Sequence, residues 1–206
     1  MRLTKRMKTA LAAKTVDEVP LPLSEAVDTL KKFPPTKFDQ TVEIHIRLGI
    51  DPKQADQIVR GSIVLPHGIG KSKRVVVFAK GNLADDATAA GAEEVGGDDL
   101  AKKIKGGWTD FDVCIATPDT MGVVGKLGKK LGPKGIMPNP KLGTVTQDIK
   151  NAVENAKSGQ VQYKNDKAGI VHAGIGKMNF NENDLLENLK AFFTSISKSK
   201  PDTVKG

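Results

Sequence analysis

The sequence predicts an α/β protein in which a Rossmann-like, three-layer α/β domain is inserted into a split α+β domain. Two apolar runs near the middle of the chain, at 75–79 and 113–116, alternate with helical patterns, which is typical of parallel strands covered on both faces. Toward both ends, apolar and polar residues alternate instead, as in antiparallel strands with one solvent-facing side. We therefore expect an inserted domain at 68–158 and an outer domain built from 1–67 and 159–206.

The first elements of the outer domain follow from the hydrophobic period. Residues 1–14 contain five basic side chains and no acidic one, so they suit either an arm that orders on RNA or a frayed terminus. Apolar residues at helical spacing predict a helix over 23–33, which should end at the proline pair that follows. Strict alternation predicts a strand over 41–48 with one core face and one face toward water or a ligand. A second, short strand is expected at 61–66.

The remaining elements repeat these two patterns. In the insert we expect helices at 82–91, 98–105 and 119–127. Alternation returns at 161–163, and a turn at 165–169 leads into another strand. An apolar stripe over 185–196 predicts a final helix. The two connections between the domains, near 67 and 159, should act as a hinge.

Charge and composition narrow the class of function. Lys and Arg exceed Asp and Glu by 32 to 24, a net charge of +8 that favours an anionic partner, with nucleic acid ahead of a membrane surface. Plain solubility charge is the alternative. The one cysteine, Cys114, fits a reducing cytoplasm and, within its apolar run, an inert core thiol. No apolar run approaches the roughly 20 residues that span a membrane, and the start lacks the apolar stretch of a secretory signal.

Glycine–lysine pairs raise the possibility of a nucleotide site, but their spacing rejects it. A Walker loop that ends at Gly70-Lys71 would need a glycine at Leu65, and one that ends at Gly125-Lys126 would need a glycine at Thr120. Lys73 stands where the third glycine of a dinucleotide fingerprint belongs. No nucleotide cofactor is expected.

Catalytic and metal chemistry have even less support. His45, His67 and His172 are far apart in the chain, and none has a second ligand at metal-binding spacing. No Ser or Cys lies in a nucleophile-elbow sequence. The acidic residues clustered over 85–99 fall in and around expected helix starts, where carboxylates are favoured electrostatically. We expect no enzyme activity, no catalytic residue and no metal.

The segment GKKLGPKGIMPNPKLGTV, at 128–145, is the most basic part of the insert. Residues 126–141 contain five lysines and no acid, whereas 82–119 contain nine acids and three lysines. Prolines stiffen such a segment, and glycines let backbone N–H groups approach a phosphate closely. We expect a rigid, basic loop that faces a polyanion through Lys126, Lys129, Lys130, Lys134 and Lys141.

This basic segment resembles the signature of the bacterial ribosomal L-one family. Similarity extends over TKFDQTVEIHIRLGIDPKQADQIVRGSIVLPHGIGK (36–71), AGAEEVGG (90–97), GWTDFD (107–112) and NDKAGIVHAGIGK (165–177), in the family's order. The resemblance therefore covers nearly the whole chain.

The resemblance implies a two-domain ribosomal protein in the cytoplasm. In the family, the split domain is the main binder of the large-subunit rRNA of the mobile side stalk, and the protein is a monomer within the ribosome. The stalk moves to help release deacylated tRNA from the exit site. Family members also repress translation of their own operon by binding its mRNA. A non-ribosomal RNA-binding translational repressor is the alternative function.

The resemblance also implies RNA-contacting positions where its motifs are intact. These are a first-strand group (Lys37, Phe38, Thr41 and Glu43) and a turn (Asn165, Asp166 and Lys167). We expect Lys37 on a phosphate, Phe38 on a sugar or base, Thr41 as a hydroxyl partner, and Glu43 accepting from a 2′-OH or a base N–H. Without the resemblance, core packing would be the simpler role for Phe38, and an ion pair with Arg47 the simpler role for Glu43.

The C-terminus departs from the family pattern. Family members usually continue beyond the position that matches Gly206 with a strand and a threonine-methionine-glycine loop that also touches rRNA. Without that strand, we expect one sheet edge of the outer domain to carry unpaired N–H and C=O groups, and the RNA interface to lose several hydrogen bonds.

Overall fold

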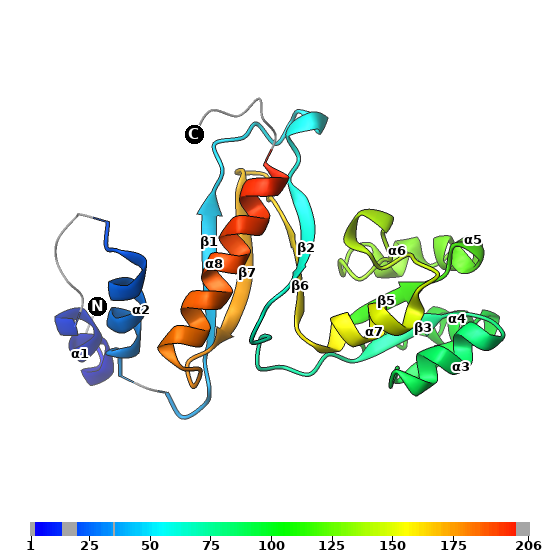
Figure 1. The fold of residues 1–206 in the computed structure, drawn as a ribbon, viewed down its shortest axis with the longest axis horizontal. Helices are drawn as coiled ribbons and strands as arrows, with labels where there is room; N and C mark the ends of the chain where they lie inside the picture. Colours follow the sequence, from blue (N-terminus) through cyan, green and yellow to red (C-terminus); the bar gives the residue numbers. More distant parts are fainter. Residues whose placement is uncertain (1–2, 14–19, 35, 201–206) are drawn as a thin grey trace.

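The computed structural model describes residues 3–13, 20–34 and 36–200, and confirms the predicted α/β class. The described residues form two halves joined by two crossings of the chain (Figure 1). The outer half contains the described residues up to 64 and those at 160–200, and the middle half contains 75–157. The buried residues of two hydrophobic clusters all lie in the middle half, and those of two others all lie outside it.

Antiparallel strand pairs in the outer half join segments from opposite ends of the chain. β1 (Thr41–Arg47) pairs with β7 (Ile170–Lys177), and β2 (Arg60–Val64) pairs with β6 (Gln160–Lys164). A bridge between residues 165 and 171 connects the end of β6 to β7. Within the described chain, β1 and β2 each pair with a single strand.

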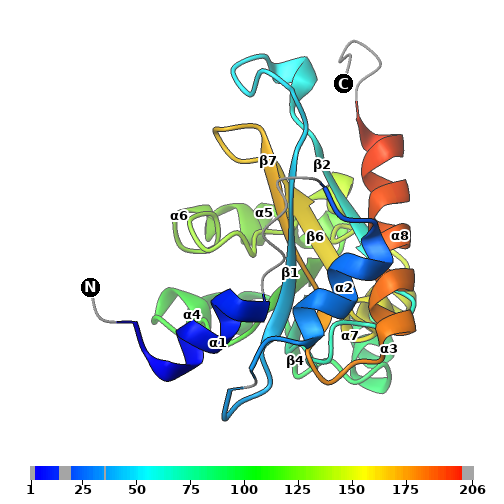
Figure 2. The same ribbon diagram turned by 90° about the vertical axis from the view of Figure 1, so that its left-hand side faces the viewer.

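The long helix α8 (Glu182–Ser199) covers the inner side of these strands (Figures 1 and 2). Its buried stripe confirms the predicted apolar spacing and includes Leu185, Leu189, Phe192 and Ile196. Helix α2 (Leu23–Lys31) packs beside it and buries Val27 in the same cluster as Val42 and Leu185.

The expectation of an arm or a frayed terminus at 1–14 is wrong for 5–13, which form helix α1 (Lys5–Ala13). Residues 1, 2 and 14 lie outside the described residues. The prediction considered only charge, whereas KRMKTALAA contains mostly strong helix formers and no glycine or proline. Thr4 caps the helix, because its Oγ1 accepts a hydrogen bond from the N–H of Met7 at 3.2 Å.

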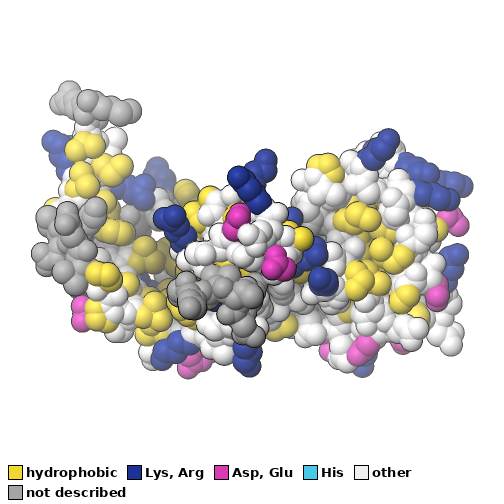
Figure 3. Space-filling view, turned by 90° about the horizontal axis from the view of Figure 1, so that it is seen from above, with side chains coloured by type: hydrophobic (Ala, Val, Ile, Leu, Met, Phe, Trp, Pro, Cys, Tyr) yellow, Lys and Arg dark blue, Asp and Glu magenta, His cyan; other side chains and the backbone are white. Residues whose placement is uncertain are grey.

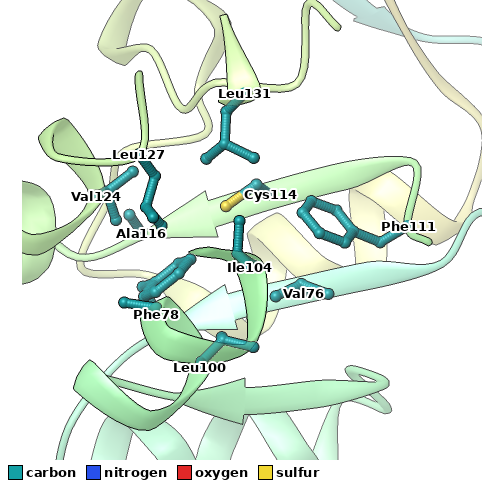
Figure 4. Close-up of a cluster of buried hydrophobic side chains, with 11 residues drawn as sticks. Val76, Phe78, Leu100, Ile104, Phe111, Cys114, Ala116, Val124, Leu127 and Leu131 are labelled. Atoms are coloured by element: carbon teal, nitrogen blue, oxygen red, sulfur yellow. The ribbon is translucent and has the colours of Figure 1, made fainter. Parts of the chain in front are cut away.

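The middle half is a three-layer arrangement around a parallel sheet of order β4-β3-β5. The strands are β3 (Val75–Phe78), β4 (Glu94–Gly96) and β5 (Val113–Ala116). Helices α3 (Asn82–Ala89) and α7 (Ile149–Lys157) cover one face. Helix α4 (Asp98–Lys105) and the segment from α5 (Met121–Gly125) through α6 (Gly128–Leu131) cover the other (Figure 4).

Four elements of the middle half differ from the sequence prediction. Strand β4 was not expected, because its three residues contain an acid and no apolar run. Helix α7 was missed, although its buried residues Ile149, Val153 and Ala156 have helical spacing. The helix expected at 119–127 is a 3-10 turn followed by α5, which ends at Gly125. The expected loop at 128–145 contains helix α6 and a 3-10 turn at Pro140–Leu142.

Cys114 is the inert core thiol that the sequence predicts. It is 1% exposed on β5, among the side chains of α4 and α6 (Figure 4). Burial raises the pKa of Cys114 to about 12, so the reactive thiolate is not formed near neutral pH.

The two crossings between the halves touch at a pair of glycines. Gly68 and Gly159 both have positive φ (63° and 96°), and a Cβ on Gly159 would lie 2.5 Å from the Cα of Gly68. A hydrogen bond also joins the two halves: the hydroxyl of Ser62 on β2 donates to the carbonyl of Leu142 at 3.1 Å. The crossings and this contact place the segment at 135–142 against the outer half.

Asn188 of α8 anchors the first crossing. Its side chain is fully buried and accepts from the N–H of His67 (3.1 Å) while its amide donates to the carbonyls of Gly68 (3.0 Å) and Ile175 (2.8 Å). Next to it, His67 Nε2 lies 2.7 Å from Glu187 Oε2, a hydrogen bond that raises the pKa of His67. Helix α8 therefore holds both strand β7 and the start of the connection to the middle half.

We predict that Asn188→Ala lowers the free energy of unfolding by about 2 kcal/mol, because one buried and two partly buried backbone groups lose their partner. Urea unfolding followed by circular dichroism measures this. Asn183→Ala is the matched control, since Asn183 lies exposed in the same helix. Equal stability of the two variants would contradict the anchoring role of Asn188.

Candidate nucleic-acid interface

One face of the β1–β7 pair is open to solvent and carries polar and charged side chains. On β1 these are Thr41, Glu43, His45 and Arg47, whereas Val42, Ile44 and Ile46 face the core. On β7 the same face carries His172, opposite His45, and Lys177, opposite Thr41. The alternation on β1 follows from the period of two in an extended strand.

The first-strand group begins just before this face. The side chain of Phe38 is 70% exposed. Phe38 therefore does not pack in the core, which was the simpler role for it without the resemblance. Its segment is held by backbone contacts: the carbonyl of Phe38 accepts from Thr36 Oγ1 at 2.7 Å, and Met178 N–H donates to the carbonyl of Gln40 at 2.9 Å. Lys37 is exposed beside it. An aromatic ring and an ammonium group therefore project from an ordered segment.

Thr41 and Glu43 continue the group along β1. Thr41 Oγ1 accepts from Lys177 Nζ at 2.9 Å. Glu43 does not form the alternative ion pair with Arg47 among the described residues; its Oε2 lies 3.9 Å from His45 Nε2. Its carboxylate is 57% exposed and can accept further hydrogen bonds.

The predicted turn lies at the opposite end of the same face. Asp166 Oδ1 accepts from the N–H groups of Ala168 and Ile170, both at 2.8 Å, and the hydrogen bond from Ile170 is the main cause that lowers the pKa of Asp166. Lys167 is exposed at the tip. Because β1 is seven residues long, Thr41 at its start lies about 20 Å from the end of the strand beside the turn.

Asn165 differs from the expectation that it contacts RNA. Its side chain is 7% exposed, accepts from the N–H of Val59 at 2.9 Å and donates to the carbonyl of Asp166 at 3.0 Å. Both ends of the amide are therefore used inside the protein. Asn165 positions the turn, and its neighbours Asp166 and Lys167 present their side chains to solvent.

Sequence reasoning did not assign four further residues on this face, namely His45, Arg47, His172 and Lys177. His45 and Arg47 could have been found on β1, because they lie an even number of residues from Thr41 and Glu43 and therefore point to the same side of the strand. For the two on β7, the signal required knowledge of the strand register, which the sequence does not provide.

Helix α1 lies beside the first-strand group. A cavity of about 240 Å³ is lined by Arg6 and Ala10 of α1 together with Thr41 and Glu43 of β1. Arg6 Nε also donates to the carbonyl of Pro34 at 3.3 Å. The basic N-terminal segment therefore adds positive charge at this end of the face.

The basic segment of the middle half is only partly available to a ligand. Lys130 Nζ donates to the carbonyls of Ile104 (3.4 Å) and Lys105, at the end of α4, and Lys134 Nζ donates to Thr109 Oγ1. Lys126, Lys129 and Lys141 are exposed, and their side chains form no hydrogen bond or ion pair with a described residue. Helices α5 and α6, in the segment that carries these lysines, lie away from β1 and β7 (Figure 1). Figure 3 shows Lys and Arg over both halves, interspersed with acids.

Two other kinds of site are not found among residues 3–13, 20–34 and 36–200. No group of three or more His, Cys, Asp or Glu is arranged to hold a metal ion. No helix there is long and apolar enough to cross a membrane.

Comparison with known proteins identifies the family of the chain. The sequence matches the profile of the Ribosomal protein L1p/L10e family over residues 30–206. It is 54% identical to the large ribosomal subunit protein uL1 of Alkalilimnicola ehrlichii, 55% identical to that of Dechloromonas aromatica and 54% identical to that of Coxiella burnetii. Each match covers 100% of this chain and 88% of the relative. The chain therefore belongs to the Ribosomal protein L1p/L10e family, whose members are structural, non-enzymatic ribosomal proteins.

Proposed function

We propose that this protein is a structural constituent of the large ribosomal subunit and binds rRNA through the exposed face of β1 and β7. Phe38 carries the proposal: a 70% exposed aromatic ring stands on an ordered segment at the start of a strand with polar outward side chains. Such a ring can stack on a base or ribose. The names of the relatives and the net charge of +8 support the same reading.

The geometry of this face fits the backbone of folded RNA. Lys37 and Lys167, at its two ends, would meet two separate phosphates. Between them, the carboxylates of Glu43 and Asp166 would accept hydrogen bonds from 2′-OH groups, which distinguish RNA from DNA. Thr41, whose hydroxyl accepts a hydrogen bond from Lys177, would face the same RNA strand.

We further propose that the chain works as two domains, with 1–67 plus 159–206 as the RNA binder and 68–158 as the insert. The separate buried clusters of the two halves support this division. The finer roles rest on the family resemblance: holding side-stalk rRNA as a monomer in the cytoplasmic ribosome, assisting release of exit-site tRNA, and repressing translation through the mRNA of its own operon. Sedimentation of the tagged protein tests the ribosomal role, because a dedicated repressor would stay outside the large-subunit peak.

Lys37→Ala should reduce the salt dependence of rRNA binding by about one unit in the slope of log K against log salt, because one phosphate contact is lost. Filter binding over a series of salt concentrations measures the slope. Lys150→Ala is the control, since Lys150 is exposed on α7 in the middle half. If Lys37→Ala keeps the slope of the unmodified protein, Lys37 does not contact a phosphate.

Phe38→Ala should weaken rRNA binding about tenfold, because base–aromatic stacking contributes roughly 1–3 kcal/mol. The matched control is Phe193→Ala, which removes a 52% exposed ring from α8, on the side of the strands away from the proposed interface. Equal affinity losses in the two variants would argue against stacking by Phe38.

Replacing Lys126, Lys129 and Lys141 together with alanine should change rRNA affinity less than Phe38→Ala does. These lysines lie in the middle half, away from the face that carries the proposal. The same binding assay tests this division of labour. A larger loss in the triple variant would move the main RNA contact to the basic segment.

A further inference from the structure

The centre of the β1–β7 face holds a histidine pair that the proposed contacts do not use. His45 and His172 are cross-strand partners, and their Nδ1 atoms lie 2.5 Å apart. The rings meet edge-on, with centroids 4.8 Å apart. Both side chains are about half exposed, 55% for His45 and 48% for His172.

Each ring also has a carboxylate at its other nitrogen. His45 Nε2 lies 3.9 Å from Glu43 Oε2, and His172 Nε2 lies 3.3 Å from Asp166 Oδ2. The four side chains thus form one row across the face, carboxylate–imidazole–imidazole–carboxylate. Both carboxylates belong to the two residue groups that the proposed function assigns to RNA.

Counting protons along this row gives its charge. At an Nδ1–Nδ1 contact one imidazole donates N–H and the other accepts, so the contact holds one proton. A carboxylate at each Nε2 favours N–H there as well. With N–H at both Nε2 atoms and one proton between the Nδ1 atoms, the pair carries three protons on four ring nitrogens, one more than two neutral imidazoles carry. In that state the pair has one positive charge.

The other charged groups near the pair are few. On β1, Glu43 and Arg47 lie two residues to either side of His45. On β7, the positions two residues from His172 are Ile170 and Gly174, which are uncharged. The turn contributes Asp166, and Arg6 of α1 lines the same cavity as Glu43. Glu43 and Asp166 are therefore the acidic groups beside the pair, and Arg47 and Arg6 are the basic ones.

We propose that the His45–His172 pair is part of the RNA interface and takes up a proton when RNA binds. This inference rests on the proposed function. Carboxylates that accept from 2′-OH groups also repel the neighbouring phosphates, and one positive charge between them offsets that repulsion. Histidine is the side chain that gains its charge between about pH 5 and pH 8. Because the protonated pair binds the polyanion better, rRNA affinity rises as pH falls.

The test compares rRNA affinity at about pH 6 and pH 8 at one salt concentration. Purified large-subunit rRNA is the probe. The unmodified protein should bind about three- to tenfold more tightly at the lower pH, as expected for partial uptake of one proton. In His45→Gln/His172→Gln the change should be less than about twofold, since glutamine keeps polarity but does not titrate.

His67→Gln is the matched control. It removes the third histidine of the chain, which pairs with Glu187 near the crossing, and should leave the pH response intact. The inference is overturned if the double variant responds to pH as the unmodified protein does, or if the unmodified protein shows no response while Lys37→Ala still weakens binding. No rRNA binding at either pH would instead overturn the proposed function.

A second measurement needs no variant. Proton NMR of the ring C–H resonances follows all three histidines through a pH titration, with and without RNA. RNA should move the titration midpoints of His45 and His172 to higher pH and leave that of His67 in place. Unchanged midpoints at 45 and 172 would also overturn the inference.

Discussion

The antiparallel pairing of β1 with β7 is the contact on which the rest of this molecule depends. It joins residue 41 to residue 177, so that a segment early in the chain and a segment near its end share one ladder. The inner side of this ladder packs on α8, and its outer side carries the proposed RNA contacts. One backbone arrangement therefore builds a core and an interface at once, because successive side chains of a strand point to opposite faces.

The chain between β1 and β7 crosses to the middle half and back. Once β1 pairs with β7, the intervening residues must leave the outer half and return to it, and they do so at the glycine contact of residues 68 and 159. Asn188, whose side chain is buried, ties the outgoing crossing to α8 through hydrogen bonds with His67 and Gly68. The parallel sheet between the crossings packs in two clusters whose buried residues all lie in the middle half.

The proposed interface is assembled from side chains that the core does not need. Phe38, Lys37 and Lys167 are exposed, and their removal would leave the buried clusters unchanged. The residues that position them are buried or bonded to backbone, as Asn165 is. Binding and folding are therefore separated residue by residue, although they share two strands. The histidine pair joins the two proposed contact groups through Glu43 and Asp166.

Periodicity by itself determined the fold class, the strand at 41–47 with its outward residues, and the stripe of α8, because burial of one face imposes a repeat that is visible in one segment. It missed β4, whose three residues are too few to show a period, and helix α1, for which charge alone was considered. Tertiary structure decided the composition of the site. A register shift in the β1–β7 pair places Lys177 on the same face as His172, although a strict period of two would put them on opposite faces. The same tertiary contacts bury Asn165 while exposing Phe38, because which neighbour covers a side chain depends on segments far away in the sequence.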